Sequence, residues 1–553
     1  MRSKSNSLFN SVFGPIRIRL VILLAIFLLF SNGCLPAASP SNSQENDQPQ
    51  SDPGSEVAKS EALASGSAAD APLAREIDRL IYEDELASAR WGVSVISLRD
   101  GRNVYARNAD RLFTPASNMK LFPTSVGLEL LGADYRWRTS VYAAAPPDAT
   151  GIVAGDLVLY GRGAPDLVAS PSANAEDSNS LTQLANDLYD RGVRRINGSV
   201  VGDESYFRGE TLGDGWQWND VQWYFGAEAS ALSINKNEVA VNVLPPDKSE
   251  TSPLVKVNDP SGYVTIENKM TVVPAAERMT IGIHRGLSDN TVRVWGTFPL
   301  ASKGFGARLS VNKPALWAAK LFRETLRARG ITVDGAAQFR DARQPPPERF
   351  DPSKFIELAF VSSKPLSEII KATNKGSINL YAELILRTIG RERESMLSTP
   401  GSGGRERGDD EAGLAVIHLW LNRSGVSTNG LALHDGSGLS RLNLVTPISF
   451  ARLLVAISKS PAGHTFRDSL PLSGRDGTLG NRLTEHAERV SAKTGYLTYD
   501  TSLSGYVTTS DGEEFAFSII CNDETGRARS GRLVDQIVSL LATYPRIIPK
   551  KAH

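Results

Sequence analysis

The sequence is poor in the side chains that most often carry metal or thiol chemistry. Its 553 residues include six histidines and two cysteines. The histidines are scattered, without a His-Glu-x-x-His motif or another paired metal-ligand spacing. The sequence also lacks a Gly-x-Ser-x-Gly motif and a phosphate-binding glycine loop ahead of a helix. We therefore expect no cofactor and no metal, and we interpret His434 beside Asp435 as loop packing rather than half of a catalytic triad.

The sequence also lacks an excess of charge of either sign. Lys and Arg together number 61, and so do Asp and Glu. We therefore expect no nucleic-acid partner, because no strong basic field is present. The apolar content of 41% and the charged content of 22% are ordinary for a globular protein. Since 553 residues exceed what one hydrophobic core usually serves, we expect two or more domains.

The N-terminus has the pattern of an export signal. Four cations precede an apolar run from Leu20 to Phe30, which is too short to span a bilayer. Residues 1–33 contain no acid, so their removal leaves 57 cations against 61 acids, a net charge of −4. We predict a signal peptide over residues 1–33 and an exported protein of the periplasm or cell envelope.

The two cysteines have different surroundings. Cys34 follows Gly33 behind the apolar run and resembles the cleavage box of bacterial lipoproteins, although Ser31 stands where that box prefers leucine. Both a lipid anchor at Cys34 and ordinary signal cleavage nearby remain open. Cys521 ends an apolar run and is predicted to be a buried thiol. No disulfide framework is implied, and residues 34–72 have the composition of a disordered linker.

The two ends of the chain are predicted to form one domain. Near the front, residues 73–81 have the periodicity of an amphipathic helix, and residues 91–106 that of a β-hairpin. Near the back, three strand-like segments lie between residues 489 and 521, and a helix follows at 533–541. We expect these five strands to join in one antiparallel sheet with both terminal helices on one side.

Between these ends, residues 135–305 alternate short β-type runs with turn-rich polar stretches, which predicts a mostly β insertion of one or two small domains. Helical periodicity resumes at 314–329, and further helices are expected at 365–371, 379–390, 411–424 and 446–458. The expected organisation is a signal peptide at 1–33, a linker at 34–72, a first domain part at 73–134, the insertion at 135–305 and a second domain part at 306–553.

A Ser-x-x-Lys spacing occurs at Ser117, Ser233 and Ser310, and context separates the three. Ser233 lies in a strand-like stretch, where residues three apart face opposite ways. The lysine that follows Ser310 precedes a proline, which disfavours a helical residue there. A helix beginning at Ser117 puts Lys120 on the same face, and burial would lower the Lys120 pKa so that it can accept the Ser117 proton. The alternative is a capping serine with a surface lysine.

Two further motifs follow in order. Ser377-Ile378-Asn379 lies in a short polar loop ahead of an apolar helix, where Ser377 can relay a proton and Asn379 can hold a substrate backbone. The alternative for Ser377 is a helix cap. Lys493-Thr494-Gly495 ends a predicted strand, where Lys493 and Thr494 can grip a carboxylate while Gly495 lets a peptide lie close. Backbone N–H groups of Ser117 and Tyr496 are the expected oxyanion donors.

The three motifs together resemble those of penicillin-binding proteins and class A β-lactamases. Further stretches, at 216–220, 225–233, 434–441 and 472–478, are similar to the D-Ala-D-Ala carboxypeptidase/endopeptidase family of class C low-molecular-mass penicillin-binding proteins. The similarity runs from about Leu73 to the C-terminus. It implies an α/β (α+β) fold: a β-lactamase/transpeptidase-like domain whose five-stranded antiparallel sheet is flanked by helices and carries a large insertion.

By this resemblance Ser117 is the acylated nucleophile and Lys120 its base. Ser377 and Asn379 form the second motif, and Lys493 with Thr494 clamps the carboxylate. In the insertion, Asp220 resembles an acid that meets a peptide side-chain amine in relatives; its alternative is a surface residue that caps a turn. The loop from Asp435 to Ser440 is either the back wall of the site or a structural turn. The implied partners are peptidoglycan stem peptides and β-lactam antibiotics, and the oligomeric state is left open.

Two positions depart from the family pattern. Tyr496 replaces the small hydroxyl residue that usually follows Lys-Thr-Gly, which removes one side-chain contact to the carboxylate. Ala164 stands where relatives often have an acid. Two other functions are also considered: a β-lactamase, which the insertion and the lack of a deacylating glutamate motif disfavour, and a non-catalytic peptidoglycan-binding module, which the intact serine and lysines disfavour.

Overall fold

The computed structural model describes residues 70–169, 179–246, 252–343, 350–397, 408–525 and 530–544. The predicted signal peptide, Cys34 and nearly all of the predicted linker lie outside these ranges. Within them, every helix is too short or too polar to cross a membrane.

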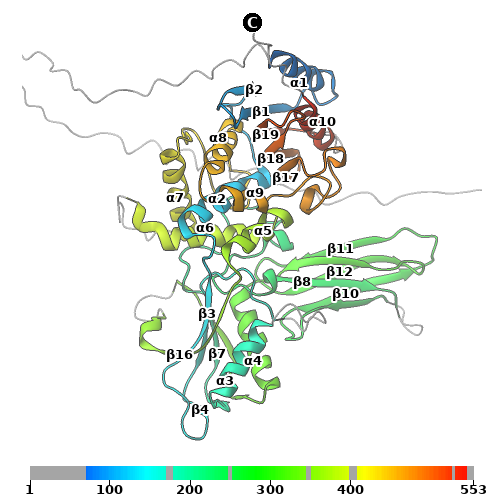
Figure 1. Cartoon of the computed structure of the whole chain (residues 1–553). Helices are drawn as coiled ribbons and strands as arrows, with labels where there is room; N and C mark the ends of the chain where they lie inside the picture. Colours follow the sequence, from blue (N-terminus) through cyan, green and yellow to red (C-terminus); the bar gives the residue numbers. More distant parts are fainter. Residues whose placement is uncertain are drawn as a thin grey trace, which may run out of the picture. The chain divides into compact units, whose positions relative to one another are not determined.

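A five-stranded antiparallel sheet forms the centre of the first domain (Figure 1). Its order is β17-β18-β19-β1-β2, so strands from both ends of the chain lie side by side, as predicted. The strands are β1 (Arg90–Ser97), β2 (Asn103–Arg107), β17 (Val490–Leu497), β18 (Asp500–Thr508) and β19 (Glu514–Asn522). β18 and β19 are buried along nearly their whole length, because helices cover both faces of the sheet.

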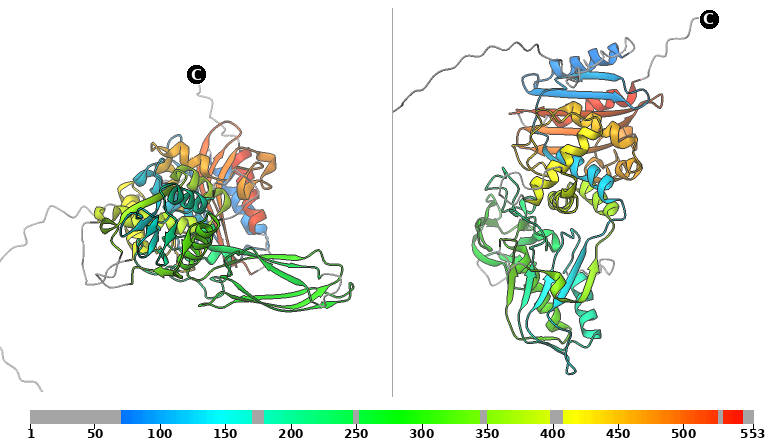
Figure 2. Two further views of the ribbon diagram at one scale, coloured as in Figure 1. Left: turned by 90° about the horizontal axis from the view of Figure 1, so that it is seen from below. Right: turned by 90° about the vertical axis from the view of Figure 1, so that its left-hand side faces the viewer.

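The two terminal helices cover one face of this sheet. Helices α1 (Ala71–Glu83) and α10 (Ser530–Thr543) lie next to each other (Figure 2). Both bury an apolar stripe against the sheet, where the Cys521 thiol lies in the same hydrophobic cluster. The predicted placement of both helices on one side and of Cys521 in the core is therefore confirmed.

The helices next to the Ser-x-x-Lys and Ser-x-Asn motifs lie on the other face, together with three more. A second hydrophobic cluster joins these helices to the sheet. They are α2 (Leu121–Leu131), α5 (Leu366–Gly376), α6 (Asn379–Arg393), α7 (Asp409–Arg423), α8 (Pro447–Ser458) and α9 (Gly463–Ser469). The start of α8 follows its sequence signal, since Thr446 accepts a hydrogen bond from the Ser449 N–H and Pro447 occupies the first turn.

The insertion contains a mixed sheet of its own, in the order β15-β7-β5-β3-β16. These strands are β3 (Arg138–Ala143), β5 (Leu157–Tyr160), β7 (Val200–Asp203), β15 (Ala337–Arg340) and β16 (Ile356–Ser362). Helices α3 (Ser180–Asp190) and α4 (Pro314–Ala328) share its hydrophobic core. The sheet thus takes in segments beyond residue 305, where we expected the insertion to end, because β15 and β16 pair with β7 and β3 across long stretches of sequence.

Three further small sheets lie in the described part of the insertion. One has the order β13-β8-β9, one the order β10-β12-β11, and one the order β14-β6-β4. Their strands are β4 (Ile152–Val153), β6 (Arg195–Ile196), β8 (Glu238–Leu244), β9 (Leu254–Val257), β10 (Thr265–Val273), β11 (Thr280–Arg285), β12 (Thr291–Pro299), β13 (Phe305–Ser310) and β14 (Thr332–Val333). The β-type runs expected from the sequence in this region all contribute strands.

Candidate active site

The Ser-x-x-Lys motif forms a single 3-10 turn, η1 (Ala116–Lys120), that leads into α2. We expected an α-helix here. The tighter 3-10 turn aligns side chains three residues apart, and Lys120 Nζ lies 2.8 Å from Ser117 Oγ. Ala116, just before the serine, has a left-handed backbone with φ of 48°, a conformation that costs about 1–3 kcal/mol in a non-glycine residue. One strained backbone position therefore lies directly before the serine.

Lys120 is fully buried, and its amine has two further close partners. Nζ lies 2.6 Å from Asn379 Oδ1 and 2.6 Å from the Ser437 carbonyl oxygen. Burial lowers the pKa of Lys120 to about 7, although the negative charges of Asp435 and Glu383 oppose the shift.

These contacts fix what a neutral Lys120 can do. A neutral amine has two N–H donors and one lone pair, and the two carbonyl oxygens can only accept hydrogen bonds. They therefore take both N–H groups and leave the lone pair for the Ser117 O–H. The geometry is that of a serine whose proton can pass directly to Lys120.

The Ser-x-Asn motif occupies the junction between α5 and α6. Ser377 ends α5 in a left-handed conformation with φ of 53°, and Asn379 is the first residue of α6. Lys493 Nζ lies 2.8 Å from Ser377 Oγ, and the Lys493 amine is fully buried. Burial, and secondarily the charge of Lys120, lower the pKa of Lys493. The Ser377 hydroxyl therefore contacts Lys493, while the Asn379 amide oxygen contacts Lys120.

Strand β17 brings the Lys-Thr-Gly motif against the nucleophile turn. A Cβ atom at Gly495 would lie 2.2 Å from Ser502 Oγ and 3.0 Å from the Ser117 backbone nitrogen. A side chain at position 495 would collide with these atoms, so only glycine lets β17 lie this close to the turn that holds Ser117. Thr494 Oγ1 lies 2.7 Å from Thr478 Oγ1, and the Tyr496 side chain is exposed.

The insertion forms part of the same site. The Asn379 amide nitrogen donates to the Phe225 carbonyl oxygen at 2.8 Å. A cavity of about 570 Å³ is lined by Ser117, Ser377, Asn379, Asp220, Thr478, Tyr496 and residues around them. Burial raises the pKa of Asp220, while the positive charge of Arg441 opposes this shift. Asp220 also lies in a turn, because its carbonyl accepts from the Trp223 N–H.

The sequence reasoning assigned no role to a buried ion pair on α6. Glu383 and Arg387 are both buried, and their side chains lie 2.9 Å apart. Glu383 Oε1 also accepts from the N–H groups of Gly436 and Ser437, at 3.0 and 2.8 Å. It thereby holds the backbone N–H of Ser437, the residue whose carbonyl meets Lys120. The sequence signal for this pair is two opposite charges four residues apart within the mostly apolar run from Leu380 to Ile389.

The loop from Asp435 to Ser440 is folded around the Asp435 carboxylate. That carboxylate accepts from the N–H groups of Gly438 and Ser440, both at 2.8 Å, and from the Trp216 indole at 2.9 Å. His434 instead contacts Asp214 at 2.7 Å. His434 and Asp435 are thus parts of loop packing, in line with the interpretation made from the sequence.

Neither of the other two Ser-x-x-Lys spacings forms such a pair. The sequence predicted a strand at Ser233, but residues Asn235–Asn237 form a left-handed turn ahead of β8. The side chain of Asn237 accounts for this turn, because it accepts a hydrogen bond from the Ile234 N–H and donates one to Ser233 Oγ.

Comparison with known proteins indicates the family of the chain. The sequence pattern of the D-Ala-D-Ala carboxypeptidase 3 (S13) family matches residues 73–544. The chain is 35% identical over 506 residues to a D-alanyl-D-alanine carboxypeptidase of Actinomadura sp. (strain R39), covering 88% of this chain and 87% of that protein. It is 26% identical over 423 residues to D-alanyl-D-alanine carboxypeptidase DacB of Haemophilus influenzae, covering 74% and 80%.

A solved structure shows the same fold. The crystal structure of penicillin binding protein 4 (dacB) from Haemophilus influenzae matches with a TM-score of 0.69 at 25% identity, covering 85% of this chain and 99% of that chain. The resemblance seen in the motifs and the predicted fold class are both confirmed. The chain therefore belongs to the D-Ala-D-Ala carboxypeptidase 3 (S13) family, a family of serine peptidases among the low-molecular-mass penicillin-binding proteins.

Proposed function

We propose that this protein is a D-Ala-D-Ala carboxypeptidase and endopeptidase that trims peptidoglycan stem peptides through an acyl-enzyme on Ser117. The observation that carries the proposal is the set of three contacts around Lys120 Nζ. Two carbonyl oxygens occupy its N–H groups, and its lone pair is left for the nucleophile. The pKa of Lys120, lowered to about 7, leaves a substantial neutral fraction at neutral pH.

In the acylation step the Ser117 proton passes to Lys120 as Oγ attacks the carbonyl carbon before the terminal D-Ala. Backbone N–H groups of Ser117 and Tyr496 stabilise the negative oxygen that forms. The C–N bond then breaks, and Ser377 delivers a proton to the departing amine while it takes one from its lysine partner, Lys493. The amine leaves as free D-Ala, or as the side chain of a second stem peptide when a cross-link is cut.

In the deacylation step water attacks the ester at Ser117. Before this step Lys120 gives the proton that it took from Ser117 to solvent, and Lys493 regains the proton that it passed to Ser377. Lys120 can then take a proton from the attacking water, the ester C–O bond breaks, and the proton returns to Ser117 Oγ. A β-lactam forms the same ester by opening its ring, so the leaving amine stays attached to the product. It remains near the ester and slows the approach of water, which makes β-lactams inhibitors of this site.

The remaining site residues are proposed to position the substrate. Lys493 and Thr494 hold the terminal carboxylate, and entry of this anion beside Lys493 favours the charged amine. Asn379 fixes the substrate backbone through its amide. Asp220, half-buried in the same cavity, is proposed to meet the amine of a diamino acid side chain. A peptide ending in D-Ala-D-Ala thus meets a cation at its terminal carboxylate and an acid at its side-chain amine.

We also propose that the protein is exported by its N-terminal signal, with Cys34 as the candidate lipid-attachment site. The composition of residues 1–33 supports export. Replacement of Cys34 by serine tests the anchor: a lipidated protein moves from the membrane fraction to the soluble fraction. An unchanged distribution would contradict lipid attachment.

The central test uses purified protein, a fluorescent penicillin and a peptide that ends in D-Ala-D-Ala. We expect stable labelling and release of D-Ala, both abolished in Ser117→Ala. Rapid turnover of the penicillin would indicate a β-lactamase instead. Binding of stem peptides without labelling or D-Ala release would indicate a non-catalytic module.

A further inference from the structure

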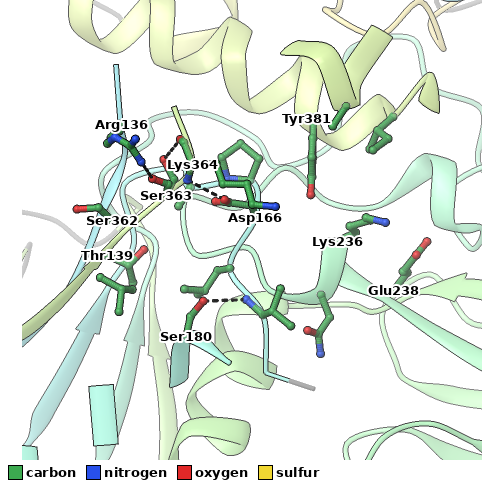
Figure 3. Close-up of a pocket in the computed structure, with 18 residues that line it drawn as sticks. Arg136, Thr139, Asp166, Ser180, Lys236, Glu238, Ser362, Ser363, Lys364 and Tyr381 are labelled. Atoms are coloured by element: carbon green, nitrogen blue, oxygen red, sulfur yellow. Dashed lines mark hydrogen bonds between the residues drawn. The ribbon is translucent and has the colours of Figure 1, made fainter. Parts of the chain in front are cut away.

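A second cavity, of about 560 Å³, lies between the insertion and the helices of the first domain (Figure 3). Arg136, Asp166 and Lys364 lie on one side, while Lys236 and Glu238 lie on the other. Helix α6 contributes Tyr381, whose hydroxyl is directed toward the cavity. The volume is in the usual range of about 300–1,000 Å³ for ligand pockets.

This cavity adjoins the active site. Three residues line both it and the cavity that contains Ser117: Lys236, Glu238 and Ile378. Ile378 stands between the two functional residues of the Ser-x-Asn motif, so the second cavity begins directly behind that motif. The two cavities are therefore neighbours, and together they offer more room than a terminal D-Ala-D-Ala unit requires.

The junction between the cavities is built on strained backbone. Asn235, Lys236 and Asn237 are three consecutive non-glycine residues with positive φ, at 48°, 57° and 54°. Such conformations persist only when surrounding contacts enforce them, and they cluster at functional sites. Here Asn235 Oδ1 accepts from the Ala169 N–H at 2.9 Å, and the Asn237 amide donates to the Glu228 carbonyl at 2.8 Å. The turn therefore fixes Lys236 at the junction.

The charges of the second cavity are mixed. Asp166 accepts a hydrogen bond from the Lys364 backbone N–H at 2.9 Å, and burial raises its pKa. The Glu238 carboxylate is mostly buried and lies 3.2 Å from Arg308. Two acids and three cations fit a ligand that carries both carboxylate and ammonium groups. A neutral sugar carries no charged group to meet Lys236 or Asp166.

We propose that the second cavity binds a peptidoglycan peptide chain at a part remote from the bond that is cut. In this arrangement Lys236 meets a carboxylate of the peptide, and Asp166 meets an ammonium group. The proposal rests on the proposed function of the Ser117 site and extends it, since it makes cross-linked peptides better ligands than short terminal ones.

Binding can be measured without turnover in the Ser117→Ala background. The ligands are a peptide dimer cross-linked as in the cell wall and a short acyl-D-Ala-D-Ala peptide, and the readout is Kd. We expect Lys236→Gln and Asp166→Asn each to weaken dimer binding about tenfold and short-peptide binding less than twofold. Lys236→Arg should restore dimer binding. The exposed Lys459, outside both cavities, supplies the matched control Lys459→Gln, which should change neither Kd.

Equal weakening of both ligands, or no change in either, would overturn the proposal. Repeating the measurement with the disaccharide attached to the dimer identifies the occupant. An effect of the variants that is seen only with the disaccharide would assign the cavity to sugar and reject the peptide. Penicillin labelling of the otherwise wild-type protein is an independent readout, so a failed subsite is distinguished from a failed Ser117 site. Thermal melting confirms that each variant is folded.

Discussion

Replacement of Glu383 by glutamine should separate the two tasks of this buried carboxylate. Glutamine removes the charge that faces Arg387 but keeps an oxygen that accepts from the Gly436 and Ser437 N–H groups. Breaking a buried ion pair by removing one partner costs about 3–5 kcal/mol. Because Asp410 remains 3.6 Å from Arg387, we expect the lower end of that range.

A loss of about 3 kcal/mol corresponds to a fall in Tm of about 6 °C at roughly 2 °C per kcal/mol. Thermal melting measures this fall. Glu383→Gln with Arg387→Gln should regain part of it, because neither position then holds a buried charge. A Glu383→Gln variant with the same Tm as the wild type would refute the claim that the pair stabilises the fold.

Activity tests the second task of Glu383. Glutamine keeps the hydrogen bonds to the loop, so we expect penicillin acylation within tenfold of the wild-type rate. Alanine removes them and leaves the backbone N–H of Ser437, the residue whose carbonyl meets Lys120, without its carboxylate partner. A misplacement of about 1 Å near the chemistry can cost about 100-fold, which is the loss we expect for Glu383→Ala. Acylation by Glu383→Ala at the wild-type rate would show that the carboxylate does not position the site.

Three further predictions concern the nucleophile and the carboxylate clamp. The pKa of Lys120 is lowered to about 7, so its neutral, proton-accepting form is lost as the pH falls below 7. Acylation measured by stopped flow at pH 5 should therefore run at about 1% of the plateau rate. A rate that does not change with pH would contradict this prediction. Gly495→Ala should slow acylation about 100-fold, because the added Cβ meets the turn that holds Ser117. The control Gly531→Ala, with open space around the added atom, should leave the rate unchanged. Equal acylation rates for the two variants would refute the close approach of β17 to this turn. Tyr496→Thr should raise kcat/KM for D-Ala release about tenfold by restoring a hydroxyl to the carboxylate clamp, and an unchanged value would show that Thr494 and Thr478 suffice.

The central sheet could be predicted because its signals are local. Alternation of apolar and polar residues marked the strands at both ends of the chain, and Thr446 with Pro447 marked the start of α8. The extent of the insertion could not be predicted in the same way. β16 belongs to the insertion only because it pairs with β3, more than 200 residues earlier, and no short-range pattern encodes that pairing.

The site was predictable to the level of its three motifs. Each motif was weak alone, but their order and joint presence indicated one chemistry. The supporting residues were not predictable, because their role depends on contacts between distant segments. Glu383 acts on a loop more than 50 residues away, and Lys236 was interpreted as part of a strand although asparagine side chains fold its segment into a turn.

The most direct test of the account is peptide mapping of the protein after inactivation with penicillin. Trypsin releases residues 112–120 as one peptide, which contains Ser117 and ends at Lys120. We predict that mass spectrometry finds the added mass of one penicillin on this peptide, at Ser117, and none in Ser117→Ala. An adduct on any other peptide, or an inactivated protein of unchanged mass, would contradict the claim that Ser117 is the nucleophile.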